Sequence, residues 1–355
     1  MKAALWHARN DIRVEDVPAP TAPGPGEVII RVGACGICGT DLEEYRAGPL
    51  FIPVDKPNPL TGRMAPMILG HEFAGEVVEV GKGVTDFRVG DRLAPDVIIG
   101  CGHCYWCRRN QLILCDSLAA LGLMGDGGLA EYCRLPVNMA VKLPSGLMDE
   151  HAAMAEPLAV AVRAVRRGRM LAGETVTVFG GGTIGLFCVQ AARAAGAAAV
   201  FVVEPLANRR ALAMQLGASD VIDPLTTDPA TTLRRWTRGI GPDLVLEASG
   251  SATVIPGAIE TARKGGRIVL VGLPVSATGF NFFHVVATEK EIIGSLSHVY
   301  DEDYYTAIRW LGDGRVVAEP LISARVPLSN FMADGLARLE ERPAETLKVI
   351  ILPHA

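Results

Sequence analysis

A glycine-rich turn between two apolar runs constrains the fold of this chain more than any other segment. It lies in TVTVFGGGTIGLFCVQAARAAGAAAVFVVE, residues 175–204. An alternating β run precedes Gly180, Gly182 and Gly185 in G-x-G-x-x-G spacing, and a helical stretch then stops at Gly196. The first glycine permits a tight turn, the second lets a pyrophosphate approach the backbone, and the third allows close helix packing. The segment therefore predicts a dinucleotide-binding unit of strand, helix and strand.

The end of the second β run favours one dinucleotide. Glu204 can accept hydrogen bonds from the adenosine ribose hydroxyls and would repel a 2′-phosphate, so NAD is favoured over NADP. Arg209 and Arg210 leave NADP open, because a guanidinium can pair with a 2′-phosphate; otherwise both are solvated helix residues. The candidate cofactor contacts are Gly180, Gly182, Thr183, Ile184, Gly185, Glu204, Arg209 and Gly272.

Half of the eight cysteines are crowded into CGHCYWCRRNQLILC, residues 101–115. The N-terminus is charged and lacks the apolar core of a signal peptide, so we expect a cytoplasmic protein, where clustered cysteines favour metal over disulfides. The C-x2-C-x2-C-x7-C spacing lets four thiolates surround a zinc ion and leaves no open position, as in structural sites. An iron–sulfur cluster or disulfide pairing is the alternative. The ligands would be Cys101, Cys104, Cys107 and Cys115.

The length of the chain, 355 residues, indicates two domains, since a single hydrophobic core stops growing near about 250 to 300 residues. Residues 1–155 contain short β-like runs separated by Pro and Gly, which is typical of an antiparallel barrel or sandwich. Residues 156–295 alternate apolar β runs with helical stretches, which predicts a parallel sheet covered on both faces. Residues 296–355 return to short strands and turns, and we expect them to pack on the first part.

Composition argues against two kinds of partner. The net charge is −5 and no basic tract is present, which disfavours nucleic acid. The longest uncharged run, residues 175–192, includes three consecutive glycines and four polar residues. A strand, a turn and a helix explain this run better than a membrane span does.

Two further fragments can supply metal ligands. They are CGICGTD, residues 35–41, and GHEFAG, residues 70–75. Cys38 and His71 are ligands that zinc prefers, although a buried cysteine and a core histidine are the commoner cases when each is taken alone. The two fragments become informative only with the rest of the chain.

Together, these motifs resemble the zinc-dependent medium-chain alcohol dehydrogenases over nearly the whole chain. The resemblance rests on GHEFAGEVVEVGKGV, the four-cysteine loop, AEPLAVAV at residues 155–162, and the glycine turn. Within that family, EYRAGPLFIPVDKPNPLTGRMAPMILGHEF, and EKEIIGSLSH followed by GRVVAEPLI, are similar to the 2,3-butanediol and polyol (sorbitol-type) dehydrogenases. The resemblance implies an α/β plus β fold, with a GroES-like β-barrel catalytic domain and a Rossmann domain with a doubly wound parallel sheet.

The resemblance also implies a catalytic zinc in the cleft between the domains. It places the metal on Cys38 and His71, with Glu156 or the adjacent Glu72 as the carboxylate ligand. The remaining position would hold the substrate hydroxyl, which zinc acidifies before hydride passes to the nicotinamide. Thr40 is expected to receive the alcohol proton.

Other residues at family positions carry secondary expectations. Asp41 would hold the second ring nitrogen of His71. Glu43 stands where relatives often carry the histidine that ends the proton relay, so the relay would end in a carboxylate or in solvent. Arg163 stands where the butanediol-type pattern usually has histidine. Candidate substrate contacts are Ser297, His298 and Tyr300.

The expected function is reversible, NAD-dependent oxidation of a secondary alcohol, such as 2,3-butanediol or another vicinal diol or small polyol. A dehydrogenase for threonine, sorbitol or a bulky cyclic alcohol is the first alternative. A noncatalytic NAD-binding zinc protein is the second. A homo-oligomer is expected from the family resemblance.

Overall fold

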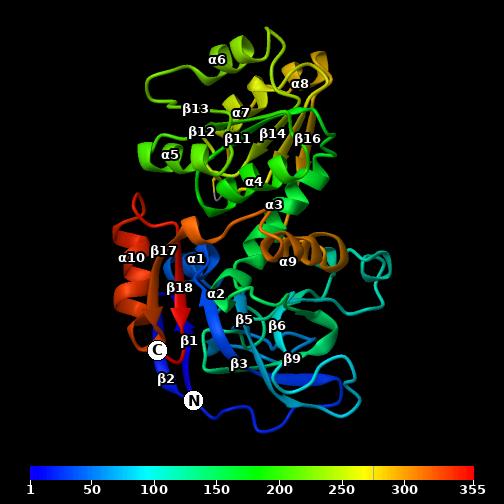
Figure 1. Ribbon diagram of the computed structural model, residues 1–355, viewed down its shortest axis with the longest axis vertical. Coiled ribbons are helices and arrows are strands. Elements are labelled where there is room, and N and C mark those ends of the chain that lie inside the picture. The colour runs from blue at the N-terminus through cyan, green and yellow to red at the C-terminus, as the bar shows by residue number, and fades with distance from the viewer. Residues whose placement is uncertain (275) are drawn as a thin grey trace. The chain divides into compact units, whose positions relative to one another are not determined.

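The computed structural model describes residues 1–274 and 276–355, which form two compact units (Figure 1). Unit 1 comprises Met1–Glu156, Val299–Asp313 and Ala318–Ala355, and unit 2 comprises Pro157–His298 and Gly314–Val317. Residues 296–298 and 314–317 therefore group with unit 2, whereas the sequence led us to expect them in the C-terminal segment.

Unit 1 is built on a mostly antiparallel sheet of order β10-β6-β5-β3-β18-β17, with β9 also paired to β3. Its strands are β3 (Glu27–Gly36), β5 (Glu72–Val80), β6 (Arg92–Pro95), β9 (Tyr132–Pro136), β10 (Ala140–Lys142), β17 (Ile322–Pro327) and β18 (Lys348–Leu352). Smaller sheets contain β1 (Lys2–Ala8), β2 (Asp11–Asp16) and β4 (Met67–Ile68), and β7 (Ile98–Ile99) with β8 (Ala119–Ala120). Only the β17–β18 pair of the large sheet is parallel.

Alternating apolar side chains along β3 form the centre of this core. Val28, Ile30 and Val32 are fully buried and pack in one cluster with Phe73 and Val77 of β5. Burying such side chains stabilises the fold by roughly 1.5–3 kcal/mol each. The pairing of β3 with β5 brings the end of one strand beside the beginning of the other, and the metal-site candidates lie at this junction.

Unit 2 contains an entirely parallel sheet of order β13-β12-β11-β14-β15-β16. Its strands are β11 (Thr175–Phe179), β12 (Ala199–Val203), β13 (Asp220–Ile222), β14 (Leu244–Glu247), β15 (Arg267–Leu270) and β16 (Glu291–Gly294). Its helices are α4 (Thr183–Ala194), α5 (Ala207–Gln215), α6 (Pro229–Trp236), α7 (Ile255–Thr261) and α8 (Phe283–Ala287). Figure 1 shows α4 and α5 on one face of the sheet, and α6 and α7 on the other, as right-handed crossovers require.

The strand order of unit 2 reverses direction at β11. Phe179, the last residue of β11, is paired with Val203 of β12 on one side and with Glu247 of β14 on the other. In open α/β sheets, ligands bind beyond the carboxyl ends of the strands at such a reversal. The expected parallel sheet is confirmed, and its register places the glycine turn at that point.

Unit 1 also contains α-helices. They are α1 (Gly39–Ala47), α2 (Asp149–Ala152), α9 (Tyr305–Gly312) and α10 (Ala337–Glu341), while α3 (Ala155–Arg167) runs from unit 1 into unit 2. The strands expected after residue 296 are present as β17 and β18, but α9 and α10 were not expected. Helix α9 forms because it buries Ala307, Ile308 and Leu311 along one face. In the part of the chain described, no helix is long and apolar enough to cross a membrane.

Candidate functional site

Cys38, His71 and Glu72 come together in unit 1, with their ligand atoms all within 4.8 Å of one another. Cys38 follows β3 and caps the N-terminus of α1, and His71 and Glu72 lie at the start of β5. The register pairs Gly36 with Glu72, so two distant motifs of the sequence meet at one place. A side chain on Gly36 would lie 2.2 Å from a carboxylate oxygen of Glu72, which explains the glycine.

Asp41 connects the two motifs through its two carboxylate oxygens. Its Oδ2 accepts a hydrogen bond from the amide of Cys38 at 2.9 Å. Its Oδ1 lies 3.7 Å from Nδ1 of His71, which is longer than a hydrogen bond, and neither of these buried atoms has a hydrogen-bond partner. This contact presents Nδ1 to a carboxylate, as the outer partner of a metal-bound histidine does.

The buried charges explain the pKa of His71. Burial by itself would lower the pKa of this imidazole, but the neighbouring Cys38 and Asp41 act against burial and raise it well above its ordinary value. For Asp41, burial is the largest influence and raises the pKa, while His71 lowers it. The two residues therefore favour each other's charged form.

Lys348 was not expected from the sequence, yet it contacts the centre of this cluster. Its Nζ lies 2.7 Å from Oε1 and 2.6 Å from Oε2 of Glu72, and it also donates to the carbonyl of Ile37 at 3.0 Å. The side chains of Lys348 and Glu72 are only 4% and 1% exposed. Burial would lower the pKa of Lys348, but Glu72 and then Cys38 raise it, so the ammonium is retained.

Glu156, on the first turn of α3, is the second candidate carboxylate. It is buried, belongs to unit 1, and influences the ionisation of both His71 and Lys348. Thr40, one residue into α1, places its hydroxyl 3.7 Å from Sγ of Cys38. Both positions are compatible with the roles that the family resemblance implies.

The donor atoms of this cluster suit a divalent metal. Cys38, His71 and Glu72 bring a sulfur, a ring nitrogen and a carboxylate oxygen within 4.8 Å of one another, and Glu72 is also paired with Lys348. A thiolate, an imidazole and a carboxylate are also the donor set of open zinc sites.

The four remaining candidate ligands form a separate cluster in unit 1. Cys101, Cys104, Cys107 and Cys115 are free thiols whose sulfur atoms all lie within 4.8 Å of one another. Sγ of Cys101 lies 4.0 Å from that of Cys107, and Cys104 lies 3.9 Å from Cys115. A zinc tetrahedron with bonds of about 2.3 Å requires sulfur separations of about 3.8 Å. The cluster therefore has the dimensions of a closed four-thiolate site.

Backbone amides prepare this loop for an anionic ligand set. The amide of Cys107 donates to Sγ of Cys104 at 3.4 Å and lowers the pKa of that thiol to about 6. Burial raises the pKa of Cys107 to about 12. The amides of Cys101 and Cys104 donate to further sulfurs in the same way, at 3.3 and 3.4 Å. Such N–H groups stabilise the thiolates that a metal requires.

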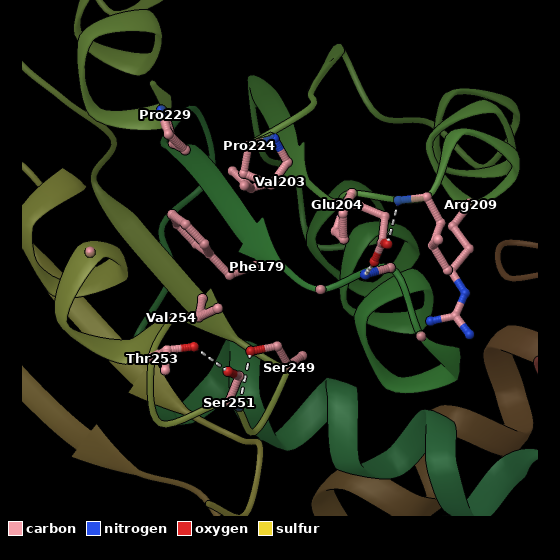
Figure 2. A pocket seen from close by; sticks show the side chains of 17 residues that line it. Phe179, Val203, Glu204, Arg209, Pro224, Pro229, Ser249, Ser251, Thr253 and Val254 are labelled. Atoms are coloured by element: carbon pink, nitrogen blue, oxygen red, sulfur yellow. Dashed lines mark hydrogen bonds between the residues drawn. The ribbon is translucent and has the colours of Figure 1, made fainter. Parts of the chain in front are cut away.

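A pocket of about 650 Å³ opens at the carboxyl edge of the sheet in unit 2 (Figure 2). Its walls are apolar at Phe179, Val203 and Val254. Hydroxyl groups of Ser249, Ser251 and Thr253 face it from the turn after β14, as Figure 2 shows. The remaining lining includes Gly180, Gly181, Gly182, Glu204, Pro205, Leu206, Arg209, Pro224, Pro229, Ala248 and Gly257. Apolar walls with a few convergent polar groups suit a nucleotide.

Each glycine of the fingerprint has its own geometry. Gly180 has φ of +97°, which side chains disfavour. Gly182 has no atom within 4 Å of where a side chain would begin, so that position is open for a ligand. A Cβ on Gly185 would lie 1.9 Å from the carbonyl oxygen of Gly180, so glycine is needed for the helix to pack here.

Glu204 is buried at the rim of the pocket with both oxygens engaged. They accept hydrogen bonds from the amides of Gly181 at 2.6 Å and Leu206 at 2.9 Å. Arg210 forms an ion pair with Asp223 at 3.0 Å. Arg209 lines the pocket. Figure 2 shows Arg209 beside Glu204.

Some predicted residues lie elsewhere, and some pocket residues were missed. Among the described lining residues we do not find Thr183, Ile184, Gly185 or Gly272. Ser249, Ser251 and Thr253 were not predicted, although their place just after a parallel strand was a usable signal. Arg163 and His298 are buried, and the hydroxyl of Tyr300 donates to the carbonyl of Ala140 at 3.0 Å. Glu43 is half-buried, and burial raises its pKa.

Comparison with known proteins groups this chain with enzymes. Residues 24–145 match the alcohol dehydrogenase GroES-like domain, and residues 183–313 match the zinc-binding dehydrogenase domain. The chain is 36% identical to (R,R)-butanediol dehydrogenase of Bacillus subtilis, with 100% of both chains covered. It is 35% identical to L-threonine 3-dehydrogenase of Thermococcus kodakarensis, over 96% of this chain and 93% of the relative.

Solved structures give the same grouping. The crystal structure of 2R,3R-butanediol dehydrogenase from Bacillus subtilis has a TM-score of 0.92 and 37% identity, covering 99% of both chains. A zinc-binding dehydrogenase from Sinorhizobium meliloti bound to NADP has a TM-score of 0.88 and 33% identity, again over 99% of both chains. The expected GroES-like and Rossmann folds are confirmed, and with them the expectation of an oxidoreductase. The chain belongs to the zinc-dependent medium-chain alcohol dehydrogenase family.

Proposed function

We propose that this enzyme oxidises a secondary alcohol, either a vicinal diol such as 2,3-butanediol or a small polyol, to the ketone with NAD, and that the reaction is reversible. The observation that carries the proposal is the cluster of Cys38, His71 and Glu72 beside the hydroxyl of Thr40, with Glu156 buried in the same unit. The full-length likeness to butanediol dehydrogenases supports the diol. The likeness to threonine and sorbitol dehydrogenases keeps those substrates as alternatives.

We place the catalytic zinc on Cys38, His71 and Glu156. Both oxygens of Glu72 already accept hydrogen bonds from Lys348, so its use as a ligand would weaken a buried ion pair. When bound there, zinc would acidify the substrate hydroxyl, and NAD would accept the hydride from the carbon that carries this hydroxyl. Thr40 would take up the hydroxyl proton.

The proton would then leave Thr40 along α1. Glu43 follows Thr40 by one helical turn, so the two side chains lie on the same face of the helix. Burial raises the pKa of Glu43, which brings a carboxyl closer to the range in which it exchanges protons near neutral pH. Glu43 is therefore the proposed end of the relay.

For the cofactor, we propose NAD rather than NADP. The buried carboxylate of Glu204, which lines the pocket just after β12, would repel a 2′-phosphate. Arg209, which lines the same pocket, is the feature that would favour NADP. Zinc in the four-cysteine loop is proposed to be structural, because four sulfurs leave no position for substrate.

We also propose a cytoplasmic homo-oligomer. The free cysteines of the described residues suit a reducing compartment. In unit 2, β16 is the last strand of its sheet, and the neighbouring Phe282, Phe283 and Val286 are 63%, 69% and 77% exposed. An open strand edge beside large apolar side chains is a surface that a second copy can cover.

The test is NADH absorbance during incubation with NAD and each stereoisomer of 2,3-butanediol, with sorbitol, threonine and cyclic secondary alcohols in parallel, repeated with NADP. We expect turnover on one diol isomer, lost after chelation and restored by zinc. Preferred turnover of threonine or sorbitol would replace the diol assignment. The noncatalytic alternative would be supported if the chain binds zinc and NADH but none of the tested alcohols leads to reduction of NAD.

A further inference from the structure

Glu247, the last residue of β14, is a buried carboxylate that organises the rim of the nucleotide pocket. It has no exposed surface, and in residues 1–274 and 276–355 no lysine, arginine or histidine forms an ion pair with it. Its Oε1 accepts hydrogen bonds from the amide of Ser249 at 2.9 Å and from the hydroxyl of the same serine. Its Oε2 faces the amide of Gly250 at 3.4 Å. Donors of the turn that follows β14 thus face both oxygens of this side chain.

This turn borders both the pocket and the glycine loop. Ser249 and Ser251 line the pocket, and the amide of Ser251 donates to the hydroxyl of Ser249 at 3.2 Å. A Cβ on Gly180 would lie 3.0 Å from the amide nitrogen of Ser249, so the two turns are in direct contact. A displacement of Ser249 would therefore move the wall against which the pyrophosphate turn packs.

Gly272, which the sequence suggested as a cofactor contact, supports the same turn from the other side. A Cβ on Gly272 would lie 2.2 Å from the amide nitrogen of Gly250 and 3.1 Å from Oε2 of Glu247. The amide of Gly272 also donates to the carbonyl of Glu247 at 2.9 Å. The packing of the two turns thus explains why a glycine is needed at this position.

We infer that Glu247 is a positioning residue for the dinucleotide: it fixes the 249–251 turn in the shape that the cofactor needs. The inference rests on the proposed function, in which the pocket binds NAD. A carboxylate is required because both of its oxygens face donors. An amide would direct its own N–H groups at one of those donors and leave a buried group unsatisfied.

The test compares Glu247→Gln with Asp243→Asn. Asp243 precedes the same strand at its opposite end, where it accepts hydrogen bonds from the amide of Thr175 at 2.9 Å and from Nε of Arg263 at 2.6 Å. Both substitutions replace a carboxylate by an amide, but only Glu247 is beside the pocket. NADH binding to the zinc-loaded full chain is measured by fluorescence titration, with thermal unfolding of each variant recorded alongside.

We expect E247Q to bind NADH about tenfold more weakly, the scale of one hydrogen bond to a charged group, while kcat at saturating NAD and alcohol changes little. D243N is expected to lower the unfolding temperature and to keep the NADH affinity of the unsubstituted chain. Unchanged affinity in folded E247Q, or an equal loss in D243N, would overturn the inference. If E247Q does not fold, Glu247→Asp is tested in its place. This substitution keeps the carboxylate but shortens the side chain by one methylene, so that its oxygens move away from the donors of the turn.

The unsubstituted chain separates this inference from the proposed function. If it binds neither NADH nor NADPH, the cofactor assignment itself is wrong and the inference is lost with it. If it binds NADH but oxidises none of the alcohols, the substrate assignment is wrong, while the comparison of E247Q with D243N still decides the role of Glu247.

Discussion

Lys348 and Glu72, separated by 276 positions in the chain, form a buried ion pair with Nζ 2.6 Å from Oε2. Removing one partner of such a pair leaves an uncompensated charge in the core, which costs about 3 to 5 kcal/mol. We therefore expect Lys348→Met to lower the free energy of unfolding by about that amount, measured by urea titration. Lys2→Met is the matched control, because Lys2 pairs with Asp16 at the exposed surface and its loss should change little.

Replacing Cys38, the proposed zinc ligand, should separate catalysis from folding. Cys38→Ser is expected to reduce turnover by at least about a hundredfold, beyond the usual effect of changing an outer-shell residue. Elemental analysis should show that one zinc site is lost while the four-cysteine site stays filled, and the circular dichroism spectrum should be unchanged. Retention of full activity would show that the catalytic metal is not held by Cys38.

The four-cysteine loop should contribute to stability instead. Cys104→Ser removes the thiol whose pKa the Cys107 amide lowers, and with it one of four ligands. Closing a loop of roughly this length is worth about 3 kcal/mol, so we expect a loss of that order in unfolding free energy. Limited proteolysis should then cleave within residues 101–115. An equally protected loop would mean that the cluster does not hold a metal that matters for folding.

Cofactor preference should follow the two charged residues at the rim. Glu204→Ala removes the carboxylate that we propose repels a 2′-phosphate, so kcat/KM for NADP relative to NAD should rise about tenfold or more. Adding Arg209→Ala to this variant should reverse much of the gain. The ratio of kcat/KM for the two cofactors with one alcohol is the measurement. A ratio that neither substitution alters would place the ribose elsewhere.

Asp243 gives a pH-dependent contribution to stability. Burial favours the neutral acid, but the amide of Thr175 and the guanidinium of Arg263 outweigh it, so the pKa of Asp243 is lowered. A lowered pKa means that the stabilisation is complete above the unfolded-state pKa of about 3.9 and is lost as the pH falls through the folded value. The difference in unfolding free energy between the native chain and D243N should therefore be largest near neutral pH and shrink below about pH 4.

Local motifs were predictable because their residues lie close together in the sequence, so that their spacing determines their arrangement in space. Gly180, Gly182 and Gly185 act within one turn and one helix, and Cys101 and Cys115 close one short loop, so both features could be read from the sequence. The family resemblance added Cys38 and His71, which no spacing rule would have joined across the intervening residues.

Contacts that depend on the completed sheets could not be read in this way. Lys348 begins an apolar strand, and from the sequence a lysine there would be expected at an exposed edge. Only the pairing of β18 with β3 brings its ammonium into contact with Glu72. In the sequence, Glu247 looks like an ordinary polar residue at the end of a strand. Its three hydrogen-bond donors come from the following turn, and the shape of that turn depends on Gly250 having φ of +65°. Long-range pairing and turn conformation are thus the missing information.

The discontinuity of unit 1 has a consequence for biosynthesis. Its large sheet needs β18 between β3 and β17, and that strand begins at Lys348. A nascent chain that has not yet released residue 348 from the ribosome cannot neutralise Glu72 or close this sheet. Unit 2, whose strands all lie between residues 175 and 294, can assemble earlier. The cluster of Cys38, His71 and Glu72 is therefore completed only after residue 348 has emerged, when the parallel sheet of unit 2 has already had the opportunity to fold.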